Sequence, residues 1–373
     1  MKSRRNLWVV AALPVALVVG LGLVLADGSP APAHRATQTF PIQLGTSGGN
    51  VNDRSRAFCC SGTLGSLVDL NGTKQILSNN HVLARADQAA AGEDISQPGL
   101  IEVGCNVNNT NTVANFTSAP TLGSQNVDAA IAAIRSGAVD TTGAIIDVGI
   151  PSSTTATPAV GQRVAKSGRT TGLTCGSISS VNTNVSVQYQ KGCNQGKKFV
   201  ISYSNQVVIS SSTFSAGGDS GSLIVTADQA RPVALLFAGS STTTIGNPIG
   251  DVLAAFPGMG FVGGPNHGVT CPGGGGGAPS GGPGRGPHAG WEKALAAKNQ
   301  HADNLMADPA VIGVGVGADN GEAVVVIYVE EGRAHGPLPL TINGVRTLIV
   351  RTDAFRAYGW NEKLAKPGTC SAR

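Results

Sequence analysis

A mainly β fold is predicted for residues 41–271 of this 373-residue chain, followed by a small α+β module at residues 291–373. Glycine accounts for 52 residues and charged residues for only 13% of the chain, which suits short strands joined by turns better than helices. Valine, threonine, serine and asparagine are also abundant in the middle of the chain. Residues 272–290, PGGGGGAPSGGPGRGPHAG, cannot bury a core and therefore mark a linker between the two parts.

The N-terminus has the layout of an export signal. Three basic residues within the first five positions precede an almost wholly apolar run from Leu7 to Leu25, and Val24-Leu25-Ala26 offers a small-residue cleavage site. The alternative for residues 1–26 is an uncleaved membrane anchor, because about twenty apolar residues can span a bilayer. Both alternatives place the rest of the chain outside the cytoplasm. Residues 27–40, rich in proline and alanine, are predicted to form a flexible leader.

Charge and cysteine spacing argue against several function classes. The net charge of +4 includes the basic residues of the N-terminal segment, so the rest is nearly neutral and predicts no nucleic-acid partner. None of the seven cysteines has zinc-type CxxC spacing, so no metal site is predicted. In an exported chain they indicate disulfides, and Cys175 and Cys193, which flank a strand–turn–strand pattern, are the predicted pair. The odd number leaves at least one cysteine without a partner in the chain.

Strand signals begin near residue 41 and fall into two runs. Asn71-Gly72, placed between two apolar segments, is a strong hairpin signal in the first run. The predicted strands are Cys60–Val68, Lys74–Ser78 and Val127–Ile134 in the first run, and Gly161–Lys166, the hairpin between Cys175 and Cys193, Phe199–Ser210, Leu223–Thr226 and Val233–Ala238 in the second. A short helix at Asp251–Phe256 is predicted to close the second run.

The module after the linker has a different pattern. Trp291–Met306 reads as an amphipathic helix ended by Asp308-Pro309, and three strands follow, with a turn at Asp319–Gly321 between the first two. No nucleophile–base pair is evident in it. Its role stays open between an inhibitor or folding helper acting in cis, a binding domain for substrate or cell envelope, and a stabilising appendage.

The segment Ala216–Leu223, AGGDSGSL, is the candidate for chemistry. Glycines on both sides of Ser220 allow successive backbone N–H groups to point to one place, where they can hold a developing oxyanion. The serine hydroxyl beside them can attack a carbonyl. The alternative is a solvated glycine- and serine-rich turn. A catalytic role requires a base and an acid that orients the base.

His81 and Asp128 are the candidates for those two roles. His81 follows an apolar strand, and Asp128 opens the alternating strand Val127–Ile134. A serine hydroxyl needs a base at neutral pH, and histidine is the side chain whose ordinary pKa suits that task. An aspartate would hold the histidine ring in the required tautomer. Taken singly, His81 could lie in a strand-end turn and Asp128 at a solvated strand start.

Four segments in this order resemble the chymotrypsin-type serine proteases, nearest to the bacterial alpha-lytic protease and streptogrisin branch. They are LSNNHVLA around His81, VDAAIA around Asp128, KSGRTTGLTCGSI at 166–178, and GDSGS around Ser220. The resemblance covers about residues 55–262. It implies two six-stranded antiparallel β-barrels, at about 41–150 and 151–265, with the site in the cleft between them. It also implies a catalytic His81–Asp128–Ser220 triad and an oxyanion hole formed by the N–H groups of Gly218 and Ser220.

The resemblance carries two further expectations. Arg169 would pair with Asp219, and the specificity pocket would involve Phe214, Ala238 and Ser240, with no acid near its base. An apolar or small substrate side chain is therefore expected. The sequence departs from the family in its cysteines and at Ser222, which stands where the common GDSGG has its second glycine.

The resulting prediction is a secreted or envelope-anchored serine endopeptidase that cleaves proteins or peptides through an acyl-enzyme and needs no cofactor. Two alternatives are a catalytically silent binding protein with a protease fold and a serine esterase.

Overall fold

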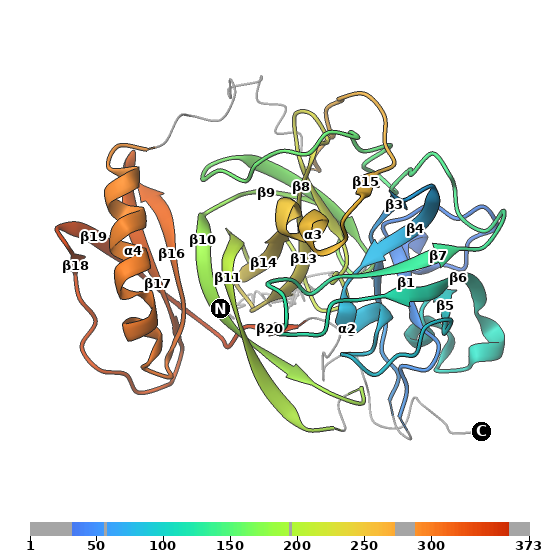
Figure 1. Ribbon diagram of the computed structural model, residues 1–373, viewed down its shortest axis with the longest axis horizontal. Helices are drawn as coiled ribbons and strands as arrows, with labels where there is room; N and C mark the ends of the chain where they lie inside the picture. Colours follow the sequence, from blue (N-terminus) through green and yellow to red (C-terminus); the bar gives the residue numbers. More distant parts are fainter. Residues whose placement is uncertain (1–31, 56–57, 194–195, 273–287, 358–373) are drawn as a thin grey trace, which may run out of the picture.

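The computed structural model describes residues 32–55, 58–193, 196–272 and 288–357. Figure 1 shows three parts in a row: a first β-barrel in blue and teal, a second in green and yellow, and the C-terminal module in orange and red. The expected signal or anchor at 1–26 and most of the glycine-rich linker lie outside the described residues. Within the described ranges, no helix combines the length and the apolar character needed to cross a membrane.

The first barrel is an antiparallel sheet with the strand order β15-β3-β4-β7-β6-β5-β1-β2. Its strands are β1 (Thr46–Asn50), β2 (Gly62–Leu64), β3 (Ser66–Leu70), β4 (Thr73–Ser78), β5 (Asp94–Gln97), β6 (Asn111–Ser118), β7 (Ala130–Ile134) and β15 (Met259–Phe261). The predicted Asn71-Gly72 turn joins β3 to β4, with positive φ at both residues. Gly65 separates β2 from β3, and a Cβ there would lie 1.9 Å from the carbonyl oxygen of Gly221. The first barrel therefore touches the serine loop directly through its backbone.

The second barrel is built from β8 to β14, with the antiparallel order β10-β11-β14-β13-β12-β8-β9. The strands are β8 (Arg163–Gly168), β9 (Gly172–Ser177), β10 (Ser180–Gln190), β11 (Lys198–Ser210), β12 (Leu223–Thr226), β13 (Pro232–Gly239) and β14 (Thr243–Pro248). The predicted fold class, mainly β with two chymotrypsin-like barrels, is confirmed, although the described residues form eight strands in the first and seven in the second where six were predicted in each. One boundary differs, because β15 pairs with β3 of the first barrel although it falls within the range predicted for the second.

Helices are few and mostly short. They are α1 (Pro32–Arg35), α2 (Asn80–Leu83), α3 (Ile249–Ala255) and α4 (Trp291–Met306), with 3-10 turns η1 (Leu100–Val103) and η2 (Val107–Asn109). The helix predicted at Trp291–Met306 is confirmed as α4, and the short closing helix as α3.

The C-terminal module packs α4 on a sheet that is continuous with the second barrel. Its strands are β16 (Val311–Asp319), β17 (Glu322–Glu330), β18 (Thr341–Ile342), β19 (Val345–Thr352) and β20 (Arg356–Ala357). Small side chains of α4, including Ala294 and Ala297, pack with valines of β16 and β17. β16 also pairs antiparallel with β10, for example Val181 with Val316. The module is therefore joined to the barrel by a shared β-ladder as well as by the linker.

The described part of the predicted leader is packed rather than free. His34 is fully buried, and its Nε2 lies 2.8 Å from the Ser167 hydroxyl. The His34 carbonyl accepts a hydrogen bond from Thr46, and the Ala36 carbonyl accepts one from Gln97. The prediction of a flexible leader over 27–40 is wrong for these residues. Composition alone could not reveal contacts with strands so distant in the sequence.

The six described cysteines form three disulfides. The pairs are Cys59–Cys105, Cys60–Cys193 and Cys175–Cys271. The predicted Cys175–Cys193 bridge is wrong, because the 11-residue strand β10 lies between the two residues. Such a strand spans roughly 36 Å and carries Cys193 away from Cys175 to meet the first barrel. Cys370 lies outside the described residues.

Candidate active site

At two positions of the serine loop the backbone has a positive φ that favours glycine. Gly218 and Gly221 have φ of +99° and +96°. A Cβ on Gly221 would lie 2.1 Å from the Ser78 hydroxyl. The loop is held from both barrels, since Thr63 donates to the Gly218 carbonyl at 3.0 Å and Thr170 donates to the Gly217 carbonyl at 2.6 Å. The loop is thus a clamped, preorganised turn, not the solvated alternative.

His81 and Asp128 come together because their strands are neighbours. His81 lies in α2 directly after β4, and Asp128 lies just before β7, which pairs with β4 through Ser78 and Ala130. The ring Nδ1 of His81 is 2.6 Å from Asp128 Oδ2, and the His81 amide donates to Oδ1 at 3.2 Å. Both side chains are fully buried. The carboxylate thus fixes the ring orientation and leaves Nε2 as its free end.

Tyr189 of β10 adds a contact that the sequence did not reveal. Its hydroxyl donates to Asp128 Oδ2 at 2.8 Å and lies 2.8 Å from the Tyr203 hydroxyl. Burial, and then the Asp128 charge, raise the pKa of Tyr189 well above its ordinary value, so the phenol stays protonated as a donor. Asn247 accepts a hydrogen bond from the Asp128 amide at 3.0 Å. Residues of the second barrel therefore help to hold the acid of the first.

Ser220 lies at the same junction of the two barrels. The Thr63 amide donates to the Ser220 carbonyl at 2.8 Å. A Cβ on Gly62 would lie 2.5 Å from Val82, which follows His81, and 3.0 Å from the Ser220 carbonyl oxygen. The Ser220 hydroxyl is 3.5 Å from the Phe237 carbonyl oxygen, and the side chain is fully buried. Within the described ranges, His81 Nε2 has no hydrogen-bond partner.

Gly218 and Ser220, whose amides are predicted to form the oxyanion hole, both lie on the clamped serine loop. Across the described segments, neither amide donates a hydrogen bond to a protein acceptor. Two such N–H groups on one rigid turn are suited to bind a developing oxyanion.

The predicted Arg169–Asp219 pair is wrong: the cation beside Asp219 is Lys166. Lys166 Nζ lies 3.5 Å from Asp219 Oδ2, and both side chains are fully buried. Burial lowers the pKa of Lys166, while Asp219 acts to raise it. The carboxylate also accepts hydrogen bonds from the amides of Thr170 at 2.8 Å and Ala216 at 2.9 Å. These bonds tie the turn between β8 and β9 to the serine loop.

Arg169 reaches in another direction. Its guanidinium pairs with Glu102 of η1 in the first barrel, and both side chains are almost fully buried. Its longer side chain spans the junction between the barrels, whereas Lys166 points into the turn. The sequence indicated a cation beside Asp219. It did not show which of the two nearby cations, Lys166 or Arg169, points toward the carboxylate. Ser222 donates to the Asp219 carbonyl at 2.6 Å and so closes the same turn.

The residues predicted for the specificity pocket are dispersed. Phe214 is fully buried in the core of the second barrel with Val164 and Ile209. Ala238 pairs with Ala357 of β20, and the Ser240 hydroxyl lies 2.5 Å from that of Thr352. The last two thus contact the C-terminal segment.

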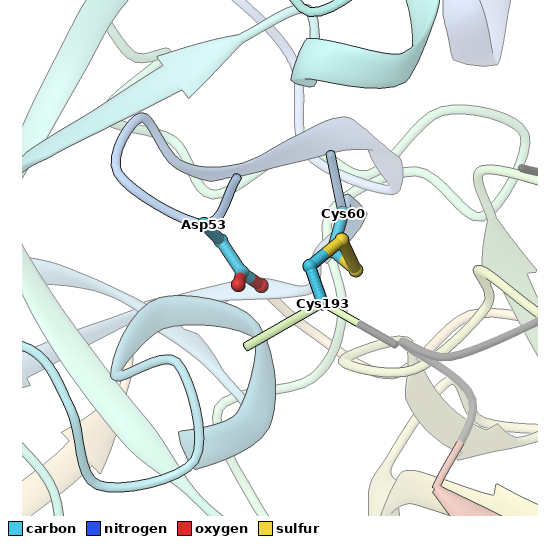
Figure 2. Close-up of side chains that lie close together, drawn as sticks. All are labelled: Asp53, Cys60 and Cys193. Carbon is cyan, nitrogen blue, oxygen red and sulfur yellow. A yellow bond between two sulfur atoms is a disulfide. The ribbon is translucent and has the colours of Figure 1, made fainter. Parts of the chain in front are cut away.

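One group of side chains in the described ranges has metal-ligand spacing. Figure 2 shows Asp53 beside Cys60 and Cys193, with ligand atoms within 4.8 Å of one another. The two sulfur atoms are joined in a disulfide and offer no thiolate. Burial raises the pKa of the Asp53 carboxyl to about 7.

Comparison with known proteins gives distant similarities. A family model described as the Nal1 C-terminal domain matches residues 107–246. No curated protein matches the chain. A glutamic acid-specific serine protease is 22% identical over 59% of this chain and 100% of its own, with a TM-score of 0.41. Protease A of Thermobifida fusca is 19% identical over 60% of this chain and 99% of its own, with a TM-score of 0.39. An alpha-lytic protease homologue, N4, is 21% identical over 59% of this chain and 98% of its own, with a TM-score of 0.40. Similarities this distant define neither substrate nor activity.

Proposed function

We propose that the chain is a serine endopeptidase that acts outside the cytoplasm, with Ser220 as nucleophile, His81 as base and Asp128 as the residue that orients His81. The observation that carries this proposal is the buried 2.6 Å contact of Asp128 with His81 Nδ1 at the same barrel junction as the serine loop. His81 Nε2, the nitrogen that must accept the serine proton, is left without a partner in the described part of the chain.

The mechanism is acyl transfer in two steps. Ser220 Oγ attacks the peptide carbonyl carbon while His81 Nε2 takes the hydroxyl proton, and Asp128 stabilises the imidazolium. The amides of Gly218 and Ser220 bind the oxyanion, and loss of one such donor typically costs ~2.7–4 kcal/mol of transition-state stabilisation. The C–N bond then breaks, and His81 returns the proton to the leaving amine. Water hydrolyses the acyl-enzyme with His81 again as base, and no cofactor takes part.

The proposed substrates are proteins or peptides with an apolar or small side chain before the cleaved bond. This preference rests on the family resemblance alone, because the three proposed pocket residues do not come together in the structure: Phe214 lies in the core of the second barrel, whereas Ala238 and Ser240 contact the C-terminal segment. A peptide-library profile dominated by basic residues would contradict it. The three disulfides support an oxidising, extracytoplasmic location, reached through the N-terminal signal or anchor.

Labelling of the full chain with a fluorophosphonate probe tests the function, with Ser220→Ala and His81→Ala as controls. Labelling and peptide hydrolysis that both depend on Ser220 are expected. Hydrolysis of esters without peptides would favour an esterase. One alternative is a catalytically silent binding protein with this fold, and the complete burial of Ser220 favours it. A silent protein would show no Ser220-dependent labelling in the wild type or in any variant.

A further inference from the structure

The chain's own C-terminal segment lies on the strand edge beside Ser220. One edge of β13 is paired with β14 from Ala234 to Gly239. The other edge is paired with β12 as far as Leu235, and then Leu236 exchanges hydrogen bonds with the serine loop. Two residues further along β13, this second edge is paired with β20. β20 therefore continues the ladder that β12 and the serine loop begin, and Figure 1 shows it against the second barrel, at the end of a red segment that comes from the module.

The direction of β20 matters. The strand is antiparallel to β13, with Arg356 opposite Gly239 and Ala357 opposite Ala238. The chain thus advances toward the position of Phe237, whose carbonyl oxygen is 3.5 Å from the Ser220 hydroxyl. An extended peptide that adds a strand to this edge would use the same backbone groups of β13. β20 and such a peptide cannot bind there together.

Several contacts hold the segment in place. The Phe355 ring is fully buried and meets Tyr328 edge-on, with ring centroids 5.8 Å apart. The Gln188 amide of β10 donates to the Phe355 carbonyl at 2.9 Å. The Thr352 hydroxyl, at the start of the segment, lies 2.5 Å from that of Ser240. The segment is therefore anchored to β10, to the module and to β13 at once.

We propose that β20 is a tethered competitor for the substrate-binding edge of β13, and that the C-terminal module keeps the site closed to extended peptides until this segment is displaced. The inference rests on the proposed peptidase function, because it concerns regulation of the same site. A tethered segment faces the edge at an effective concentration on the order of mM. The apparent affinity for a peptide is lowered by the fraction of molecules in which the edge is open. A small acylating reagent needs Ser220 but not the edge of β13, so β20 affects it less.

Two full-length variants test the proposal. Arg356→Pro removes an N–H and disfavours strand pairing by β20, and Phe355→Ala removes the anchor. Thr341→Pro is the matched control, because it places the same residue in β18, at the end of the sheet away from β10. We expect kcat/KM for an extended peptide to rise about tenfold or more in both variants, mainly through KM. The fluorophosphonate labelling rate should change less than about threefold, and the control should match the wild type.

A synthetic peptide with the sequence of residues 352–357, Thr-Asp-Ala-Phe-Arg-Ala, supplies an independent measurement. It should inhibit the Phe355→Ala variant competitively with the peptide substrate. This measurement does not depend on Arg356→Pro, so the proposal stays testable if that variant does not fold. Wild-type KM values in folded variants, or lower activity, would overturn the inference and leave the proposed function standing. Absence of Ser220-dependent labelling and hydrolysis in every form would instead refute the proposed function, and the inference with it.

Discussion

Replacing Tyr189 by phenylalanine isolates the contact that the second barrel makes with Asp128. The substitution removes one hydroxyl, which donates to the Asp128 carboxylate at 2.8 Å, and keeps the ring that stacks on Phe199 with centroids 5.5 Å apart. A hydrogen bond to a charged group contributes about 1.5–3 kcal/mol. If all of this were lost in the transition state, the rate would fall about 10- to 150-fold, since about 1.4 kcal/mol corresponds to a factor of ten.

The expected loss is smaller than that limit. Asp128 carries its charge before and during the reaction, so only the change in its orientation and in its effect on His81 alters the rate. We expect kcat/KM for a peptide to fall about tenfold in Tyr189→Phe. A carboxylate with one donor fewer also favours the protonated imidazole more strongly, so the acid limb of the pH–rate profile should move to higher pH. Tyr189 is a positioning residue, and this shift separates its role from a general loss of stability.

Tyr203→Phe is the matched control. The Tyr203 hydroxyl contacts that of Tyr189 at 2.8 Å, so its removal leaves the donor to Asp128 in place. It should alter kcat/KM less than threefold and leave the pH profile unmoved, since a neutral hydrogen bond contributes about 0.5–1.5 kcal/mol to stability only. Thermal unfolding of both variants checks the fold. Equal rates and equal pH profiles in the two variants would refute the reasoning.

Three further predictions concern stability. Lys166→Met leaves the Asp219 carboxylate buried without its cation and should lower the free energy of unfolding by about 3–5 kcal/mol in chemical denaturation. An unchanged denaturation midpoint would mean that the backbone amides alone satisfy Asp219. Asp53 has a pKa raised from 3.8 to about 7 in the folded chain, so the folded state holds its proton more tightly than the unfolded state. The contribution of Asp53 to the free energy of unfolding is therefore fully present below about pH 4 and is lost as the pH rises to about 7. It amounts to at most roughly 4 kcal/mol. Asp53→Asn should gain stability relative to the wild type across that window in unfolding series at several pH values, and a difference independent of pH would contradict the assignment. Gly65→Ala places a Cβ 1.9 Å from the Gly221 carbonyl oxygen and should both destabilise the chain and reduce fluorophosphonate labelling. Gly260→Ala in β15, where a Cβ would meet nothing within 4 Å, should leave labelling unchanged.

Local chemistry made several elements predictable. Asn71-Gly72 adopts the positive φ values of a hairpin turn, and α4 begins and ends as its apolar spacing and the following Asp-Pro indicate. The contact between His81 and Asp128 was expected from the family resemblance, and it depends on the pairing of β4 with β7, two strands that are not consecutive in the chain. Each of these features depends on residues close in the chain or on one pair of adjacent strands.

The sequence by itself therefore determined the β class, the helix α4, the serine loop and the candidate residues around it. Only the tertiary structure decided which cation lies beside Asp219, which cysteine meets Cys193, and that Tyr189 touches Asp128. It also placed β20 on the edge of β13, more than a hundred residues away in the chain. Such pairs depend on the register and curvature of two whole barrels, which set the direction of each side chain. No local spacing records that direction, because it arises only when distant strands close on one another.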